Sequence, residues 1–258
     1  MNTANERITP LPKASAPLKK PTTTKGEWKI PAALIALAAI PAIAGSFRLV
    51  TMAANVPVTP ENARFFAAPL PVIIHIIGAT LFCVLGAFQF APGFRRRRPG
   101  WHRVSGRLLV VAGIASGLSG LWMTQFYPLR GQQLQGTPLY GFRMLIGSVM
   151  VGAIILSWRA IMRRNVAQHR AWMIRAYAIG QGAGTQALVF LPWTLVIGIP
   201  NELTRDGLMI FAWLINLAVA EWIIRRKKSP ATRPDAGKPG QRAVTAPEVR
   251  IQGSGIGQ

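Results

Sequence analysis

Apolar residues dominate six stretches of the chain, separated by polar, Pro-rich or Arg-rich sequence. The stretches cover residues 31–52, 69–91, 104–126, 139–161, 172–199 and 207–224. A helix crosses the hydrocarbon core of a bilayer with roughly 20 residues, and every stretch is near that length or longer. The runs are continuous rather than alternating, and a helix satisfies its own backbone groups in lipid. The pattern therefore predicts six transmembrane helices.

The two ends of the chain differ from this apolar middle. Residues 1–29 are polar and hold four prolines among Thr, Ser and Lys, and residues 229–258 bring back Pro, Gly, Lys and Arg. Neither end repeats at a helical or strand period. The predicted organisation is an all-α membrane bundle over residues 30–228, between two disordered basic tails.

Composition narrows the class of protein further. Half of the 258 residues are hydrophobic and 15% are charged, yet Lys and Arg outnumber Asp and Glu by 30 to 8, a formal net charge of +22. A soluble domain is about a quarter charged, and a disordered basic protein lacks this many apolar residues. Nucleic-acid binding would explain the charge but not the mean hydropathy of +0.30. The single cysteine, Cys83, excludes a disulfide within the chain and a Cys-based metal site.

The basic residues are distributed as a membrane topology requires. The N-terminal tail, the connections after the second and fourth helices, and the C-terminal tail carry six, six, five and eight Lys or Arg, 25 of the 30. Basic residues gather on the cytoplasmic side of bacterial membrane proteins. We therefore expect a bacterial inner-membrane protein with both termini cytoplasmic. Its expected partners are the lipid bilayer and anionic head groups on that side, not nucleic acid.

The first helix has an alternative interpretation. Ala42-Ile43-Ala44 before Gly45 resembles a signal-peptidase site behind a basic region and an apolar stretch. The apolar run continues past this position, which favours an uncleaved anchor. Cleavage would leave five spans with the same orientation.

Two histidines are placed alike in the sequence. His102 and His169 each begin a helix at the predicted cytoplasmic surface, behind an arginine pair, and each is followed by an arginine, Arg103 and Arg170. In one interpretation the arginines orient the helices and the histidines anchor the helix ends. In the other, two imidazoles at one depth bind a b-type haem iron or share a metal, and the arginines pair haem propionates or a quinone head group.

A second group of polar residues lies deeper. His75, Arg48 and Arg143 share the predicted outer third of the membrane. Either the arginines snorkel to the surface and the histidine is hydrogen-bonded, or the three form an outward-facing basic pocket for an anion or an acidic head group. Tyr177, Gln181 and Thr185 follow at successive fourth positions of the fifth helix and share one face. Interhelical hydrogen bonding explains that stripe, with a substrate path as the alternative.

Small residues recur at the spacing used for close helix packing. Gly113 and Gly117, and likewise Ser116 and Gly120, are four apart in the third helix, and the fifth contains Gly180, Gly182 and Gly184. We expect packing within the bundle, with a homodimer face as the alternative. Glu221, the one acidic residue inside a span, is expected to pair with a neighbouring arginine.

Several segments together resemble a known family. They are Gly86-Ala87-Phe88-Gln89-Phe90 in the helix of His75, Pro99 to Arg107 around a His-Arg-x-x-Gly motif, and His169 to Tyr177 around a His-Arg-x-Trp-Met-x-Arg motif. This sequence is similar to a bacterial family of predicted multi-pass membrane proteins of unknown function, over about residues 70–225. The resemblance implies an integral membrane protein whose motif residues are His75, His102, Arg103, His169, Arg170, Trp172 and Arg175. It implies no established reaction.

Two functional classes follow from these residues. The first is a membrane redox protein that holds a haem or a quinone with the histidine and arginine motifs. The alternative is a small transporter or lipid-handling protein that uses the polar stripe and the group around His75. An accessory subunit of a membrane complex, or a homo-oligomer, stays open beside both. No P-loop, GxGxxG, HExxH or Ser/His/Asp arrangement points to another enzyme class.

Overall fold

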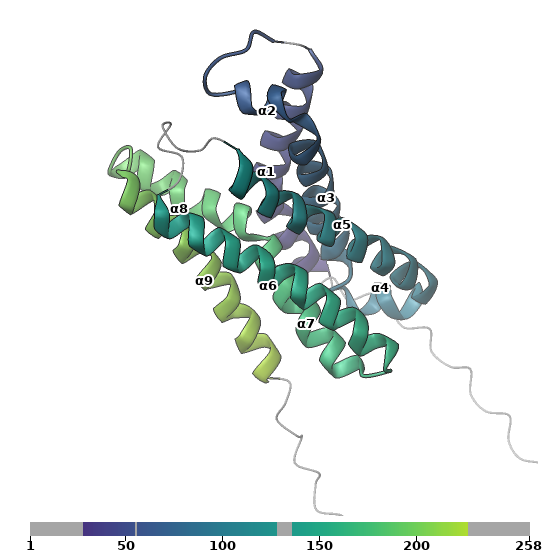
Figure 1. The fold of residues 1–258 in the computed structure, drawn as a ribbon. Coiled ribbons are helices and arrows are strands. Elements are labelled where there is room, and N and C mark those ends of the chain that lie inside the picture. Colours follow the sequence, from purple (N-terminus) through teal and green to yellow (C-terminus); the bar gives the residue numbers. More distant parts are fainter. Residues whose placement is uncertain (1–27, 55, 128–135, 227–258) are drawn as a thin grey trace, which may run out of the picture.

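The computed structural model describes residues 28–54, 56–127 and 136–226. The predicted tails lie almost wholly outside these residues. Within them the chain is helical, which agrees with the predicted all-α class (Figure 1). The helices are α1 Lys29–Ala53, α2 Ala63–Ala67, α3 Pro69–Phe88, α4 Pro92–Arg97, α5 Pro99–Phe126, α6 Thr137–Met162, α7 Val166–Gly180, α8 Gly182–Val196 and α9 Glu202–Arg226.

Five of the helices in the described part of the chain are long and apolar enough to cross a membrane: α1, α3, α5, α6 and α9. They correspond to five of the six predicted spans. Four of them, α1, α5, α6 and α9, begin two to five residues before the predicted apolar run. Prolines in the first turn and charged turns at the surface extend these helices beyond the apolar residues. The remaining predicted span, residues 172–199, is divided into α7 and α8, each of 15 residues. Neither half reaches the roughly 20 residues that a span requires alone.

The break between α7 and α8 lies at Gln181, and side chains from other helices compensate for it. The carbonyl of Ala178 accepts a bond from Asn216 Nδ2 at 3.0 Å, and that of Ile179 accepts one from Trp213 Nε1 at 3.2 Å. The carbonyl of Gly180 accepts the Cys83 thiol at 3.3 Å. In a membrane, backbone groups freed by a broken helix must find such partners. Helices α9 and α3 therefore stabilise the break.

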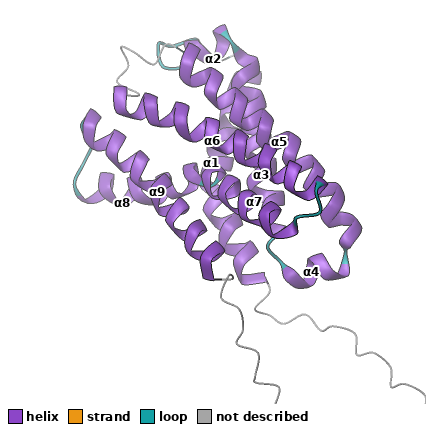
Figure 2. Ribbon diagram, turned by 60° about the horizontal axis from the view of Figure 1, so that its bottom comes forward, coloured by secondary structure: helices purple, strands orange, loops and turns teal. Residues whose placement is uncertain are grey.

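The helices form one bundle with two distinct ends. Figures 1 and 2 show α4, the α6–α7 connection and the end of α9 at one end, and α2 at the other. We call the first the basic end, because the helix ends and connections there carry Arg95 to Arg98, Arg103, Arg163, Arg164 and Arg170. Within the bundle, α5 lies between α3 and α6, α7 packs on α6, and α1 packs on α3 and α8.

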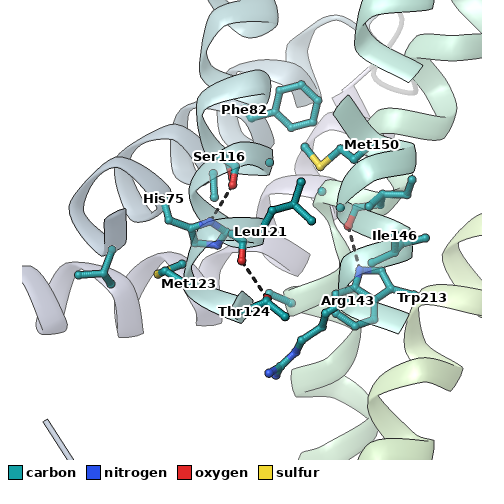
Figure 3. A pocket seen from close by; sticks show the side chains of 18 of the residues that line it. His75, Phe82, Ser116, Leu121, Met123, Thr124, Arg143, Ile146, Met150 and Trp213 are labelled. Atoms are coloured by element: carbon teal, nitrogen blue, oxygen red, sulfur yellow. Dashed lines mark hydrogen bonds between the residues drawn. The ribbon is translucent and has the colours of Figure 1, made fainter. Parts of the chain in front are cut away.

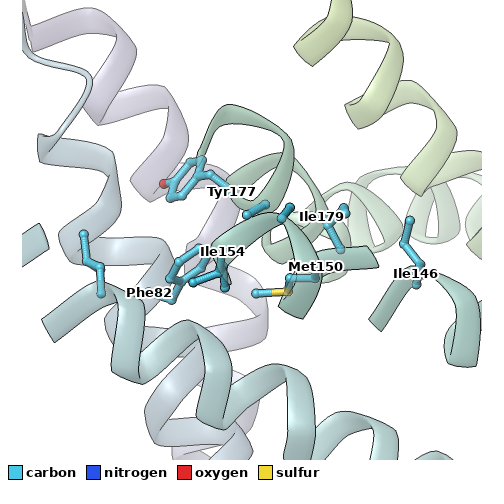
Figure 4. Packing of buried hydrophobic residues seen from close by; sticks show 9 residues of the cluster. Phe82, Ile146, Met150, Ile154, Tyr177 and Ile179 are labelled. Carbon is cyan, nitrogen blue, oxygen red and sulfur yellow. The ribbon is translucent and has the colours of Figure 1, made fainter. Parts of the chain in front are cut away.

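The bundle interior is a mixed aromatic and aliphatic core. Phe82, Ile154 and Tyr177 meet there from α3, α6 and α7, beside Met150 and Ile179 (Figure 4). The outer faces of the helices are also apolar, as the exposed side chains of Ile43, Phe47, Val111, Leu145 and Leu195 illustrate. Apolar surface of this extent requires a lipid cover rather than water. The chain is thus a membrane protein built of several apolar helices.

Glycines allow the closest helix approaches. A Cβ on Gly113 would lie 2.7 Å from Ile154 Cδ1, and one on Gly117 would lie 2.6 Å from Val151 Cγ2. Both glycines of the predicted packing motif thus face α6 within the bundle. Gly184 is tighter still, because a Cβ there would lie 2.2 Å from the Leu37 carbonyl oxygen. Pro41 has no N–H to offer that carbonyl, which leaves room for α8 to pack directly on the α1 backbone.

Candidate functional site

His169 is held in one orientation at the basic end. It is the fourth residue of α7, and its Nδ1 lies 3.1 Å from the Ser157 carbonyl oxygen and 2.8 Å from the Ser157 hydroxyl on α6. A carbonyl oxygen only accepts, so Nδ1 carries the proton in the neutral ring. The Nε2 lone pair is then left for another partner. An imidazole N–H bonded to a backbone carbonyl is the usual support of a metal-ligating histidine.

His102 occupies the matching position on α5. It too is the fourth residue of its helix, and its backbone N–H bonds to Arg98 as that of His169 bonds to Asn165. The Nδ1 atom of His102 is buried and has no hydrogen-bond partner among the described residues. His102 and His169 lie at the same end of the bundle, within electrostatic range of each other.

The arginines next to these histidines surround the pair with positive charge. Arg103 is exposed and Arg170 is half-buried, and Arg95 of α4 acts electrostatically on His102. Arg175 is engaged elsewhere: its guanidinium lies 3.1 Å from the Glu221 carboxylate on α9 and stacks on the Trp172 ring, 4.8 Å from the ring centroid. Glu221 thus pairs with an arginine, as expected.

His75 repeats the arrangement of His169 in the opposite half of the bundle. Its Nδ1 lies 2.9 Å from the Ser116 carbonyl oxygen on α5, and the Ser119 hydroxyl lies 3.5 Å from the same nitrogen. The neutral ring therefore carries its proton on Nδ1, and Nε2 has no hydrogen-bond partner among the described residues. The close approach of Gly120 to the ring, with a Cβ position only 3.2 Å from His75 Cε1, gives the imidazole its place.

His75 borders a cavity of about 410 Å³ between α3, α5, α6, α8 and α9. Figure 3 shows the imidazole on one side, with Ile146, Met150 and Trp213 across from it. Most of the lining is apolar, and Thr124, Gln186 and Ser116 add polar atoms already bonded within the protein. Enclosed, mostly apolar cavities of this size with a few oriented polar groups are typical of small-molecule sites.

Arginines from α2 and α6 border this cavity. Arg143 and Arg64 both border it, and Arg48 stacks on the lining residue Phe65 with its Cζ 4.5 Å from the ring centroid. Sequence reasoning placed Arg48 and Arg143 with His75, and the structure brings all three to this region. Arg64 was missed as a lining residue, because it reaches the cavity through the short helix α2, which carries no apolar-run signal.

A second cavity, of about 240 Å³, adjoins the first beneath α1. The two cavities share His75 and four small neighbours: Ala79, Cys83, Gly180 and Ala183. Gln181 lines the second cavity, and its Oε1 is buried without a hydrogen-bond partner among the described residues. The amide orientation is set by its nitrogen, which donates to the Leu34 carbonyl at 3.3 Å and to the Tyr177 hydroxyl at 2.7 Å.

The predicted polar stripe of Tyr177, Gln181 and Thr185 forms contacts between helices. The Tyr177 hydroxyl donates to the Cys83 carbonyl at 2.6 Å, and Thr185 Oγ1 donates to Asn216 Oδ1 at 2.8 Å. Together with the Gln181 bond to α1, these contacts tie the broken helix to α1, α3 and α9. Of the three side chains, Gln181 is the one that lines a cavity, and its amide oxygen is buried without a partner among the described residues.

Comparison with known proteins gives the family and no function. No curated protein and no solved structure matches the chain. The family described as "Predicted membrane protein (DUF2306)" matches residues 72–224, which span α3 to α9 and contain all three histidines. Because this match covers more than half of the sequence, the chain belongs to that family of predicted membrane proteins of unknown function.

Proposed function

We propose that this protein is a membrane redox protein that holds a b-type haem between His102 and His169. The observation that carries the proposal is the equal placement of His102 and His169, each the fourth residue of a helix that begins at the basic end. His169 presents Nε2 because Ser157 fixes its Nδ1, and neighbouring His102 has a buried nitrogen without a partner. Neutral imidazole nitrogen is a standard axial ligand of haem iron.

The surroundings fit the rest of such a cofactor. The propionates of haem are carboxylates, and arginine is the side chain best suited to pair with them. Arg103 and Arg170 follow the two histidines directly, and Arg95 lies near His102. The bound haem would supply one-electron chemistry, and the role of this chain is to hold the iron, compensate the propionate charge and fix both imidazoles.

The proposal includes an orientation. Placing the basic end in the cytoplasm of a bacterium puts the Arg clusters of α4 and the α6–α7 connection on the side that basic residues favour. The haem then lies near the cytoplasmic surface of the inner membrane. Alkaline phosphatase fused after the described residues should be inactive in this orientation, whereas a fluorescent protein at the same position should fold and emit. The reverse result would overturn the orientation alone.

A difference spectrum tests the haem site. The purified protein, expressed with added haem, should show an α band and a shifted Soret band on reduction with dithionite. His102→Ala and His169→Ala should each remove or strongly broaden the α band, because one axial ligand is lost. Gln168→Ala is the matched control, since this exposed side chain next to His169 contacts only Asn165. A protein without bands, or bands unchanged in both histidine variants, would refute the proposal.

A further inference from the structure

The cavities around His75 form a site that the haem proposal does not use. They lie between α1, α3, α5, α6, α8 and α9, away from His102 and His169, which line neither cavity. His75 stands where the two cavities adjoin, and the residues they share with it are small. A molecule bound at this junction would extend into both spaces and contact the imidazole.

Two residues that line the cavities carry hydrogen-bond acceptors without a donor among the described residues. His75 Nε2 is an acceptor because the Nδ1–H donates a hydrogen bond to the Ser116 carbonyl. Gln181 Oε1 is an acceptor because the amide nitrogen faces the Leu34 carbonyl, and it is buried without a partner among the described residues. A buried polar atom left unpaired costs roughly 1–3 kcal/mol. A ligand that brings hydroxyl donors to this junction would remove that cost.

The remaining walls suit an apolar, partly flat molecule. Phe82, Met150 and Trp213 line the larger cavity, while Ala38 and Ala42 line the smaller one under α1. Methionine and aromatic side chains pack well against rings. A ligand for this space therefore combines a hydroxylated ring with an apolar tail.

We propose that the two cavities bind a membrane quinol: its dihydroxy ring lies at the junction and donates to His75 and Gln181, and its apolar tail occupies the larger cavity. The reduced form is favoured over the quinone, because a quinone has carbonyl acceptors where this site needs donors. The proposal does not depend on a haem at His102 and His169, and the two can fail separately.

The arginines that line the larger cavity raise the competing possibility of an anionic lipid. Arg64 and Arg143 line the larger cavity and would attract a carboxylate or phosphate. The junction itself argues for the quinol over a fatty acid, because an ionised carboxylate has no hydrogen to donate to His75 Nε2 or Gln181 Oε1.

Binding of three related ligands to the parent protein tests the chemistry. The protein, without added haem, is reconstituted in nanodiscs of neutral phosphatidylcholine and titrated anaerobically with decylubiquinol, with decylubiquinone and with the dimethyl ether of decylubiquinol. We expect the quinol to bind about tenfold more tightly than the ether, which keeps the ring and tail but has no donors. The quinone should bind more weakly than the quinol.

A variant of His75 tests the location. His75→Asn retains an amide N–H that can donate to the Ser116 carbonyl and removes the ring acceptor that faces the cavities. It should keep the parent melting temperature within a few degrees and bind decylubiquinol about tenfold more weakly. The control Gln168→Ala, at the basic end and exposed, should bind like the parent.

Three results would overturn the quinol proposal. They are equal binding of the quinol and its dimethyl ether, unchanged quinol binding by a folded His75→Asn variant, and binding of oleate by the same nanodiscs that decylubiquinol does not displace. The last result would assign the cavities to an anionic lipid. None of these measurements involves a haem spectrum, so a failure here leaves the haem proposal standing, and the reverse also holds.

Discussion

Replacing Gly184 with alanine should separate α8 from α1. The new Cβ would lie 2.2 Å from the Leu37 carbonyl oxygen, whereas ordinary contacts begin at 3.4 Å, so one helix must move by more than 1 Å. A backbone oxygen within a helix cannot swing aside. The shift would also strain the Gln181 bond to the Leu34 carbonyl, one turn away on α1. Overpacking of this kind costs about 1–3 kcal/mol.

A matched variant separates this clash from the intrinsic effect of alanine. Gly152 lies within α6 with open space around its Cβ position, so Gly152→Ala should gain helix stability, by up to about 1 kcal/mol. One kcal/mol corresponds to about 2–4 °C for a protein of this size. In detergent, followed by circular dichroism, Gly184→Ala should therefore melt about 2–12 °C below Gly152→Ala. Equal melting temperatures would refute the described contact between α8 and α1.

Other predictions concern single interactions. Asn216→Leu removes the donor to the Ala178 carbonyl and the partner of Thr185. It should lower the free energy of unfolding by about 1 kcal/mol, measured as a fall of about 2–4 °C in melting temperature. An unchanged melting temperature would show that the break between α7 and α8 does not need α9. Burial raises the pKa of the Tyr127 hydroxyl, so the stability that this neutral group contributes is complete below pH 10 and is lost as pH rises through the raised pKa. Raising the pH should therefore destabilise Tyr127→Phe less than the parent. Identical profiles of stability against pH for the two proteins would contradict this. Cys83 is 7% exposed and should react with N-ethylmaleimide only on unfolding, so rapid labelling of the folded protein would contradict its position in the core.

Five spans could be predicted from the sequence because the signal is local. Long apolar runs and the arginines that flank them mark these helices, and the structure places them within a few residues of the prediction. The break at Gln181 could not be predicted in this way. Residues 172–199 read as one apolar run, and the groups that compensate the break come from Cys83, Trp213 and Asn216, far away in the sequence. Trp213 is mid-helix, remote from the interfaces that tryptophan prefers, because it supplies one of these bonds.

The site residues were partly predictable for a similar reason. Both His-Arg motifs follow arginine clusters, and the sequence alone indicates that each histidine lies at the start of a helix. In the structure each is the fourth residue of its helix. Ser116 and Ser157 were not recognisable as partners of His75 and His169, because their backbone carbonyls, not their side-chain types, make the decisive contacts. The cavities depend on how the helices tilt and rotate, which no single run of residues specifies.

Haem ligation by His102 and His169 is the central claim, and electron paramagnetic resonance of the oxidised, haem-loaded protein tests it most directly. Two imidazole ligands should give the low-spin ferric signal of a bis-histidine haem, and His169→Ala should convert it to a high-spin signal, because one axial ligand is lost. A parent protein that binds no haem, or a low-spin signal that persists in both His102→Ala and His169→Ala, would contradict the assignment.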